Sequence, residues 1–169
     1  MEQSNKSPFI NAAGQNLLPD TVKEALKGLP YASQDGKYFD AKVVARYFGG
    51  NYTAYVLENA NSDGEVDGCV YGLAAFEPNE FEYGDIWIPE LASVQIPVKI
   101  PGFANWVSCI ERDTSVPPLK YTLGECFAKF GELSMVPQWM EKKACEDAGL
   151  TSEKLWQTIR NSLLNKEEP

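Results

Sequence analysis

Residues 42–58 read KVVARYFGGNYTAYVLE, and this stretch decides the fold of the chain. Its two halves, 42–48 and 52–58, are rich in valine and aromatic residues, and Gly49-Gly50-Asn51 separates them. Two β-prone runs joined by a short loop that contains glycine are typical of a β-hairpin. The stretch therefore predicts two adjacent antiparallel strands.

Further strands are expected on the C-terminal side of this hairpin. Residues 68–76 are apolar on both faces, which is typical of a strand that is covered on both sides. Residues 83–88 form a shorter run, and 106–110 are a candidate fifth strand. Turn signals at Asp63-Gly64 and Pro78-Asn79 separate the runs. We therefore predict an antiparallel meander of four to five strands.

Helical patterns flank the predicted sheet. Thr21 and Glu24 have capping-box spacing at the start of an apolar stripe, which predicts an N-terminal helix. After Val116-Pro117-Pro118 the apolar period becomes helical again. The expected C-terminal helices begin at Thr122, which has capping-box spacing with Glu125, at Pro137 and at Thr151 or Ser152.

Together these patterns predict an α+β fold, with one N-terminal helix and two to three C-terminal helices. We expect three parts along the chain. They are a flexible lead-in at 1–15, the α+β meander domain at 16–115, and a C-terminal helical segment at 116–169 that packs on the sheet or on a partner.

The charge of the chain is concentrated in one segment. The 169 residues include 24 acidic and 15 basic side chains and no histidine, and the net charge is −9. No Lys or Arg occurs between Arg46 and Lys99, where nine of the acids lie, so the remaining 15 acids balance the 15 bases. Such segregation steers a basic protein partner, and the alternative is a solvated face that keeps the chain soluble. The expected partner-binding acids are Glu58, Asp63, Glu65, Asp67, Glu77, Glu80, Glu82 and Asp85.

Composition also excludes several classes of function. The negative charge repels phosphate, so we expect no direct nucleic-acid partner. The absence of histidine excludes Ser-His-Asp and Cys-His catalysis and every histidine metal site. The chain has neither an apolar run near the roughly 20 residues that span a bilayer nor a signal-peptide pattern, so we expect no membrane partner and a cytoplasmic location.

Three arrangements of side chains would permit chemistry, and each has a simpler explanation. Glu80, Glu82 and Asp85 would supply an acid/base pair, but surface carboxylates at a strand edge explain them better. Residues 61–67 place acids around a glycine, yet they lack the final glutamate and the flanking helices of a calcium loop. Cys126 lies near a helix start but also on the apolar stripe, which favours a core position. We predict no catalytic residue, no metal and no cofactor.

Two further groups are candidate sites. Trp139 and Met140 follow Pro137 and are a candidate secondary partner contact, because Trp and Met are enriched in interfaces. Glu111, Arg112 and Asp113 are a candidate polar site, in which Arg112 would act in catalysis or bind phosphate. The alternative is an arginine that neighbouring acids fix at a strand end.

A series of short motifs spans residues 16–113 in a specific order. The motifs are LLP at 17–19, LPYASQD at 29–35, VVARYF at 43–48, YTAYVLE at 52–58, DGCVYGL at 67–73, EFEYG at 80–84, PEL at 89–91 and IERD at 110–113. Their order resembles a family of unknown function that conjugative plasmids, integrative elements and phages carry. The residues at 85–87 depart from the family pattern, 96–108 look like an insertion, and the C-terminal helices lie outside the match.

The resemblance implies a small domain of a mobile genetic element in a bacterial host, and it supplies no catalytic residues. Proteins of that setting often counter host defence. The leading hypothesis is a non-enzymatic acidic interaction module that binds a basic partner. Such a partner would be a nucleic-acid-binding defence protein, which the chain would inhibit in the manner of anti-restriction or anti-CRISPR proteins. The alternatives are an enzyme or metal-binding module built on carboxylates and Arg112, and a structural or assembly subunit that associates through its C-terminal helices.

Overall fold

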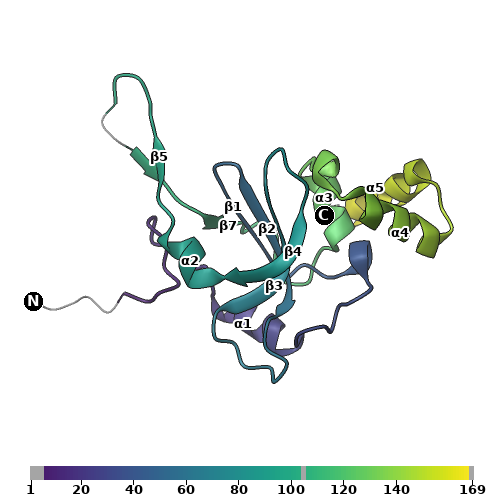
Figure 1. Ribbon diagram of the computed structural model, residues 1–169, viewed down its shortest axis with the longest axis horizontal. Coiled ribbons are helices and arrows are strands. Elements are labelled where there is room, and N and C mark those ends of the chain that lie inside the picture. The colour runs from purple at the N-terminus through teal and green to yellow at the C-terminus, as the bar shows by residue number, and fades with distance from the viewer. Residues whose placement is uncertain (1–5, 104–105, 168–169) are drawn as a thin grey trace, which may run out of the picture.

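The computed structural model describes residues 6–103 and 106–167 and has the predicted α+β fold. Five antiparallel strands form the main sheet, in the order β4-β3-β2-β1-β7 (Figure 1). Their bounds are Ala45–Gly49 for β1, Tyr52–Asn59 for β2, Cys69–Phe76 for β3, Glu82–Trp87 for β4 and Glu111–Arg112 for β7. The predicted hairpin is confirmed, since β1 and β2 pair across Gly50 and Asn51.

The predicted position of the fifth strand of the main sheet is wrong. Residues Trp106–Ser108 do form a strand, β6, but it pairs with β5 (Ile96–Val98) in a separate two-stranded sheet. Ile110 is buried in the core, and only the next two residues reach β1 as β7. The β5–β6 hairpin projects from the body of the molecule (Figure 1), with Phe103 75% and Trp106 62% exposed.

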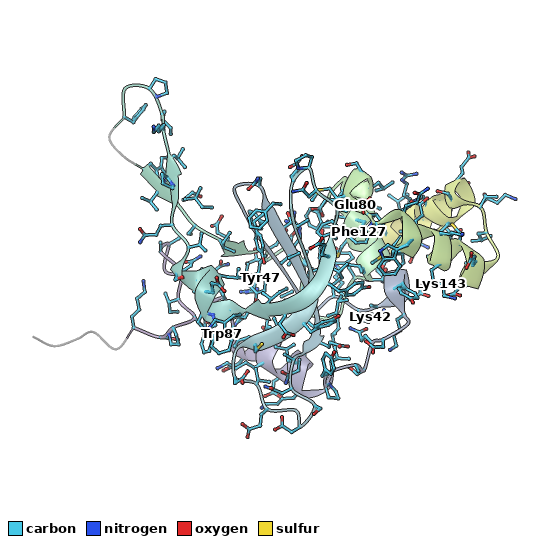
Figure 2. All side chains as sticks on the ribbon, in the orientation of Figure 1. Lys42, Tyr47, Glu80, Trp87, Phe127 and Lys143 are labelled. Carbon is cyan, nitrogen blue, oxygen red and sulfur yellow. The ribbon has the colours of Figure 1, made fainter. Side chains whose placement is uncertain are left out.

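The main sheet has a hydrophobic core on each face because successive side chains of a strand point to opposite sides. In β2, Ala54 and Val56 pack on one side, where α1 (Asp20–Lys27) and α2 (Ile88–Ser93) cover the sheet. Tyr55 and Leu57 pack on the other side, under the C-terminal helices. Tyr47 and Phe127, labelled in Figure 2, belong to these two cores respectively.

The C-terminal helices dock on the sheet of the same chain. They are α3 (Leu123–Lys129), α4 (Gln138–Ala148) and α5 (Ser152–Glu167), and a short 3-10 turn, η2 (Leu133–Met135), lies between α3 and α4. A second 3-10 turn, η1 (Tyr38–Asp40), lies in the loop before β1. Thr122 and Glu125 form the predicted capping box at the start of α3. The carboxylate of Glu125 also accepts a hydrogen bond from Ser162 and pairs with Lys166, and these contacts tie α5 to α3.

The segment before α1 is joined to the last strand of the sheet. Within the expected lead-in, the buried Asn11 donates from Nδ2 to the carbonyl of Ile110 at 2.9 Å. The Gln15 side chain pairs with the backbone of Arg112 in both directions, at 2.9 and 2.8 Å. Over the described residues, no helix is both long and apolar enough to cross a bilayer.

Candidate partner-binding site

Five aromatic side chains form a continuous row beside the outer strands of the sheet. Tyr31, Tyr71, Tyr83, Trp139 and Tyr38 follow one another in this order, and we call them the aromatic row. Consecutive ring centroids lie 5.4, 6.1, 6.2 and 5.9 Å apart. The rings of Tyr71 and Tyr83 are nearly parallel, at an interplanar angle of 19°. These side chains come from the loop before β1, from β3, from β4 and from α4.

An open hollow of about 330 Å³ lies along this row. The loop at 34–38 forms one wall, and side chains of β2, β3 and β4 form the other. The lining residues are Gln34, Asp35, Gly36, Tyr38, Leu57, Glu58, Tyr71 and Tyr83. The hollow therefore combines aromatic faces with two carboxylates, and no residue of its lining carries a positive charge.

Glu58 is held at the back of this hollow by the loop before β1. A register shift between Val56 and Glu58 interrupts the pairing of β2 with β3 at this point. The Glu58 carboxylate accepts hydrogen bonds from the backbone N–H of Ala32 at 2.7 Å and of Gln34 at 2.9 Å. Glu58 is only 1% exposed, so it is not on the outer acidic surface where the sequence places it. Its local role is to fix the loop.

Tyr71 and Tyr83 remain neutral at physiological pH. Burial raises the pKa of Tyr83 above its ordinary value of 10, and the neighbouring tyrosines and the charges of Asp35 and Glu58 raise it further. Burial, followed by Tyr31 and nearby carboxylates, raises the pKa of Tyr71 as well. These two phenols therefore keep their protons.

The other predicted acids lie on two parts of the surface. Asp63, Glu65, Asp67, Glu77, Glu80, Glu82 and Asp85 are all exposed. Glu77 and Glu80 precede β4 and Glu82 and Asp85 lie on it, at the free edge of the sheet, and we call these four the acidic edge. Asp63, Glu65 and Asp67 lie on the β2–β3 loop, where Asp63 and Glu65 line a hollow together with Lys23 and Lys27 of α1. Glu80, which lies just before β4, and Trp87, the last residue of β4, are labelled in Figure 2. Within the described part of the chain, no base pairs with any of these acids.

The loop considered as a metal site uses its polar groups to bond to itself. Asp63 accepts a hydrogen bond from the backbone N–H of Glu65 at 3.0 Å, and Asp67 accepts one from Cys69 at 2.9 Å. The amides of Asn59 and Asn61 both donate to the carbonyl of Glu65. Across residues 6–103 and 106–167, no three His, Cys, Asp or Glu side chains gather in a way that would hold a metal ion.

The structure separates the two members of the predicted secondary contact. Trp139 is 53% exposed and belongs to the aromatic row. Met140 is fully buried in the core beneath α4 and is not available to a partner, which corrects its assignment. Neighbouring residues of a helix point about 100° apart, so an interface residue and a core residue often adjoin in sequence.

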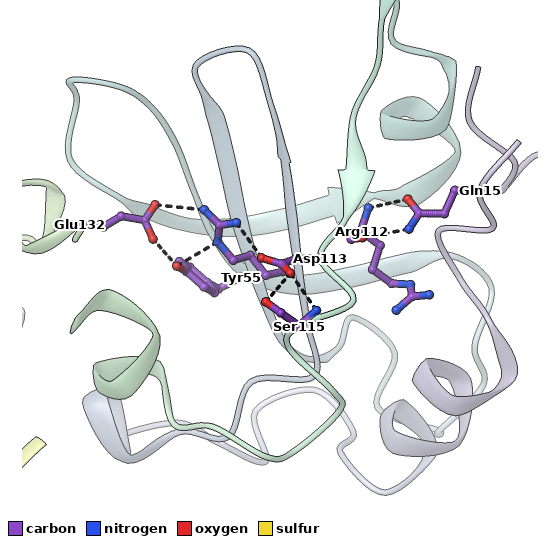
Figure 3. Close-up of polar contacts among 7 residues, drawn as sticks. Gln15, Tyr55, Arg112, Asp113, Ser115 and Glu132 are labelled. Atoms are coloured by element: carbon purple, nitrogen blue, oxygen red, sulfur yellow. Dashed lines mark hydrogen bonds and ion pairs between the residues drawn. The ribbon is translucent and has the colours of Figure 1, made fainter. Parts of the chain in front are cut away.

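The predicted polar site at 111–113 does not exist as a group, because the side chains of Arg112 and Asp113 point to different places (Figure 3). Glu111 is exposed. Arg112 lies away from Asp113, and its Nε is buried without a hydrogen-bond partner among the described residues. Asp113 pairs with Arg46, at 3.0 Å between Oδ2 and Nη1.

Arg46 is the arginine that neighbouring acids fix, and the sequence does not predict its role. Arg46 pairs with Asp113, and its Nη2 also lies 3.8 Å from Oε2 of Glu132. The Glu132 carboxylate in turn accepts a hydrogen bond from the Tyr55 hydroxyl. Its guanidinium carbon is 3.8 Å from the centre of the Phe130 ring and 5.2 Å from that of Phe48. We call this group the Arg46 nest. Its members are far apart in sequence, so no local pattern could identify it.

Cys126 is fully buried in the core, as expected. Burial raises the pKa of its thiol far above the ordinary value of 9.0, so the thiolate needed for nucleophilic chemistry does not form near neutral pH.

The sequence matches no protein-family model, and no curated protein or solved structure is significantly similar to it.

Proposed function

We propose that this chain is a non-enzymatic interaction module that binds a basic protein partner through its acidic edge and the adjoining aromatic row. The observation that carries the proposal is the set of exposed, unpaired carboxylates on β4 and in the loop that precedes it. Unpaired charges of one sign produce a field that raises the rate of encounter with an oppositely charged surface.

The order of the motifs in residues 16–113 supports a mobile-element setting for this module. A protein of that setting that carries an acidic surface has a plausible target in a host protein that binds nucleic acid, because such a protein offers a basic groove. We therefore extend the proposal to inhibition of a host defence protein, with the acidic edge occupying the surface that otherwise receives phosphate.

The test is capture of host proteins on the immobilised chain at about 50 mM and about 500 mM NaCl, with the bound proteins identified by mass. We expect a basic protein to be captured at low salt and released at high salt, because salt screens exposed charges. The triple variant Glu80→Lys, Glu82→Lys, Asp85→Lys is expected to abolish this capture.

A matched variant controls for total charge. Asp40, Glu146 and Glu153 are exposed acids outside the acidic edge, and no base pairs with them in the described residues. Reversing all three to lysine changes the net charge as much as the edge variant does. This control is expected to capture the partner as the wild type does. Equal loss in both variants, or capture that ignores salt, would refute the role of the edge.

Trp139→Ala separates the two surfaces of the proposal. Trp139 packs against Tyr83 and Tyr38 of the aromatic row and is distant from the acidic edge in the chain, and its side chain is half exposed. If the aromatic row contributes, this change weakens capture without altering its dependence on salt. If the variant binds like the wild type, the contact is confined to the carboxylates of the edge.

A further inference from the structure

The Arg46 nest shows how this protein holds a guanidinium group. The ring of Phe130 lies against the guanidinium, with its centre 3.8 Å from the guanidinium carbon. The carboxylate oxygens of Asp113 and Glu132 lie 3.0 and 3.8 Å from the guanidinium nitrogens of Arg46 and balance its positive charge. Aromatic faces attract cations through the ring quadrupole, and arginine joins this attraction to directed hydrogen bonds with carboxylates.

The hollow beside the aromatic row is lined by the same kinds of chemical group. Tyr71 and Tyr83 supply ring faces, and Asp35 and Glu58 supply carboxylates. The Arg46 nest contains its own guanidinium, whereas none of the residues that line the hollow is basic. The hollow thus has aromatic and carboxylate groups like those of the Arg46 nest but no guanidinium of its own.

We propose that this hollow receives an arginine side chain from the basic protein partner. The inference rests on the proposed function, since it assumes such a partner, and it adds the residue that the partner inserts. The partner's guanidinium stacks on the tyrosine rings and donates to the carboxylates of Glu58 and Asp35.

The geometry of Glu58 favours this occupant. Two backbone N–H groups already fix its carboxylate, so binding does not have to order that side chain. Each carboxylate oxygen retains acceptor capacity beyond the one bond it makes, and a guanidinium has five N–H groups in a planar fork. A lysine ammonium is more strongly hydrated and cannot stack, so it is the poorer occupant.

Strain in the loop supports a specific role for this wall of the hollow. Ala32 and Tyr38 have positive φ angles, of 68° and 48°, which side chains other than glycine rarely adopt. Such strain persists where surrounding contacts impose it, and it is frequent at binding sites. Here the bond from Ala32 to Glu58 is one of the contacts that hold the loop in place.

The experiment titrates the whole chain with three capped peptides, which are Gly-Gly-Arg-Gly-Gly and its versions with citrulline or lysine at the centre. Backbone amide signals of Ala32 and Gln34 and the indole N–H of Trp139 report binding in ¹H–¹⁵N NMR spectra. We expect saturable shifts with the arginine peptide, weaker shifts with the lysine peptide and none with citrulline, which has the same shape without the charge. The absence of saturable shifts, or equal shifts with citrulline, would overturn the inference.

Variants then locate the site. Tyr83→Leu and Asp35→Asn are each expected to weaken binding of the arginine peptide about threefold to tenfold. Tyr52→Leu, on the opposite face of the sheet, and Glu153→Gln, an exposed acid of α5, are the matched controls and are expected to bind as the wild type does. Asp35 is exposed, so Asp35→Asn keeps the test valid even if Tyr83→Leu fails to fold. Wild-type binding in both hollow variants contradicts the inference.

The two proposals fail in different ways. If capture of a basic partner depends on the acidic edge but not on Tyr83 or Asp35, the proposed function stands and the arginine site is refuted. If the arginine peptide binds in the hollow but no basic partner is captured in a salt-sensitive way, the site stands and the proposed function is refuted.

Discussion

Gly72 allows β3 to lie unusually close to β2. A Cβ atom at this position would overlap the backbone carbonyl oxygen of Tyr55 in the neighbouring strand. Gly84, its register partner on β4, has nothing within 4 Å of the same built atom. The two glycines are adjacent across the sheet, yet only one of them is required by packing.

We therefore expect opposite outcomes from two identical substitutions. Gly72→Ala is expected to lower the free energy of unfolding by about 3 kcal/mol, because backbone must move to admit the methyl group. Gly84→Ala is expected to leave stability unchanged or to raise it by up to about 0.5 kcal/mol, since alanine restricts the unfolded chain. Urea unfolding of both variants measures the difference. Similar losses in both would contradict the close approach at Gly72.

Two buried carboxyl groups have pKa values shifted in opposite directions. Burial raises the pKa of Glu125, but hydrogen bonds from Lys166, Thr122 and Ser162 outweigh burial and leave the pKa below its ordinary 4.5. Burial also raises the pKa of Glu132, and there the hydrogen bond from Tyr55 and the charge of Arg46 do not cancel it, so its pKa lies above 4.5. Each shift makes stability depend on pH, with opposite sign.

Glu125 contributes stability that is present above pH 4.5 and is lost as the pH falls through its lowered folded pKa. Glu132 contributes stability that is present below pH 4.5 and is lost as the pH rises through its raised folded pKa. The measurement is the free energy of unfolding from pH 3 to pH 8. Glu125→Gln should flatten the acid side of the profile, and Glu132→Gln should flatten the decline above pH 4.5. A change on the same side in both variants would contradict these assignments.

At the scale of elements, docking of α5 closes one core of the molecule. Trp156 on this helix is 4% exposed, and its ring centre lies 5.1 Å from that of Phe39. Trp139 on α4 is 53% exposed and packs on Tyr83 and Tyr38 of the aromatic row instead. Two tryptophans of the same helical segment thus have different environments.

This difference predicts the cost of removing each ring. Trp156→Ala is expected to lower the free energy of unfolding by about 3–4 kcal/mol, because it leaves a cavity between the helix and the core. Trp139→Ala is expected to lower it by less than about 1 kcal/mol, since much of that side chain is already in solvent. Chemical denaturation of both variants checks the pair. A small loss at Trp156 would mean that α5 does not stay docked on the rest of the chain in solution.

At the scale of the whole molecule, the acidic edge opposes the folded state by repulsion among its own charges. Salt shortens the range of that repulsion, from about 10 Å at 0.1 M to about 3 Å at 1 M. We expect the melting temperature to rise by about 2–4 °C between these concentrations, which corresponds to about 1 kcal/mol for a chain of this size. The rise should be smaller in the Glu80, Glu82 and Asp85 reversal than in the Asp40, Glu146 and Glu153 reversal. Equal rises in both would show that the effect comes from total charge and not from its place.

The sequence alone predicted much of the local structure and the distribution of charge, but the predicted capping box at Thr21 and Glu24 does not form, because α1 begins at Asp20 and its N-cap is Pro19. Periodicity and turn residues predicted the hairpin at 42–58, the strands at 68–76 and 83–88 and the capping box at Thr122, because neighbours along the chain decide these features. Counting charges located the acidic segment for the same reason. The fifth strand was misplaced because β7 has only two residues, too few to carry a pattern.

Only the tertiary structure decided which side chains meet. It moved Glu58 from the surface to the wall of a hollow, buried Met140, and placed Asp113 with Arg46 instead of Arg112. It assembled the aromatic row from the loop before β1, from two strands and from α4, which are distant in sequence. Such contacts depend on strand register and helix docking, which bring together residues that no local spacing relates. The sequence therefore determined where the charge lies along the chain, and the fold decided that carboxylates and aromatic rings share one site.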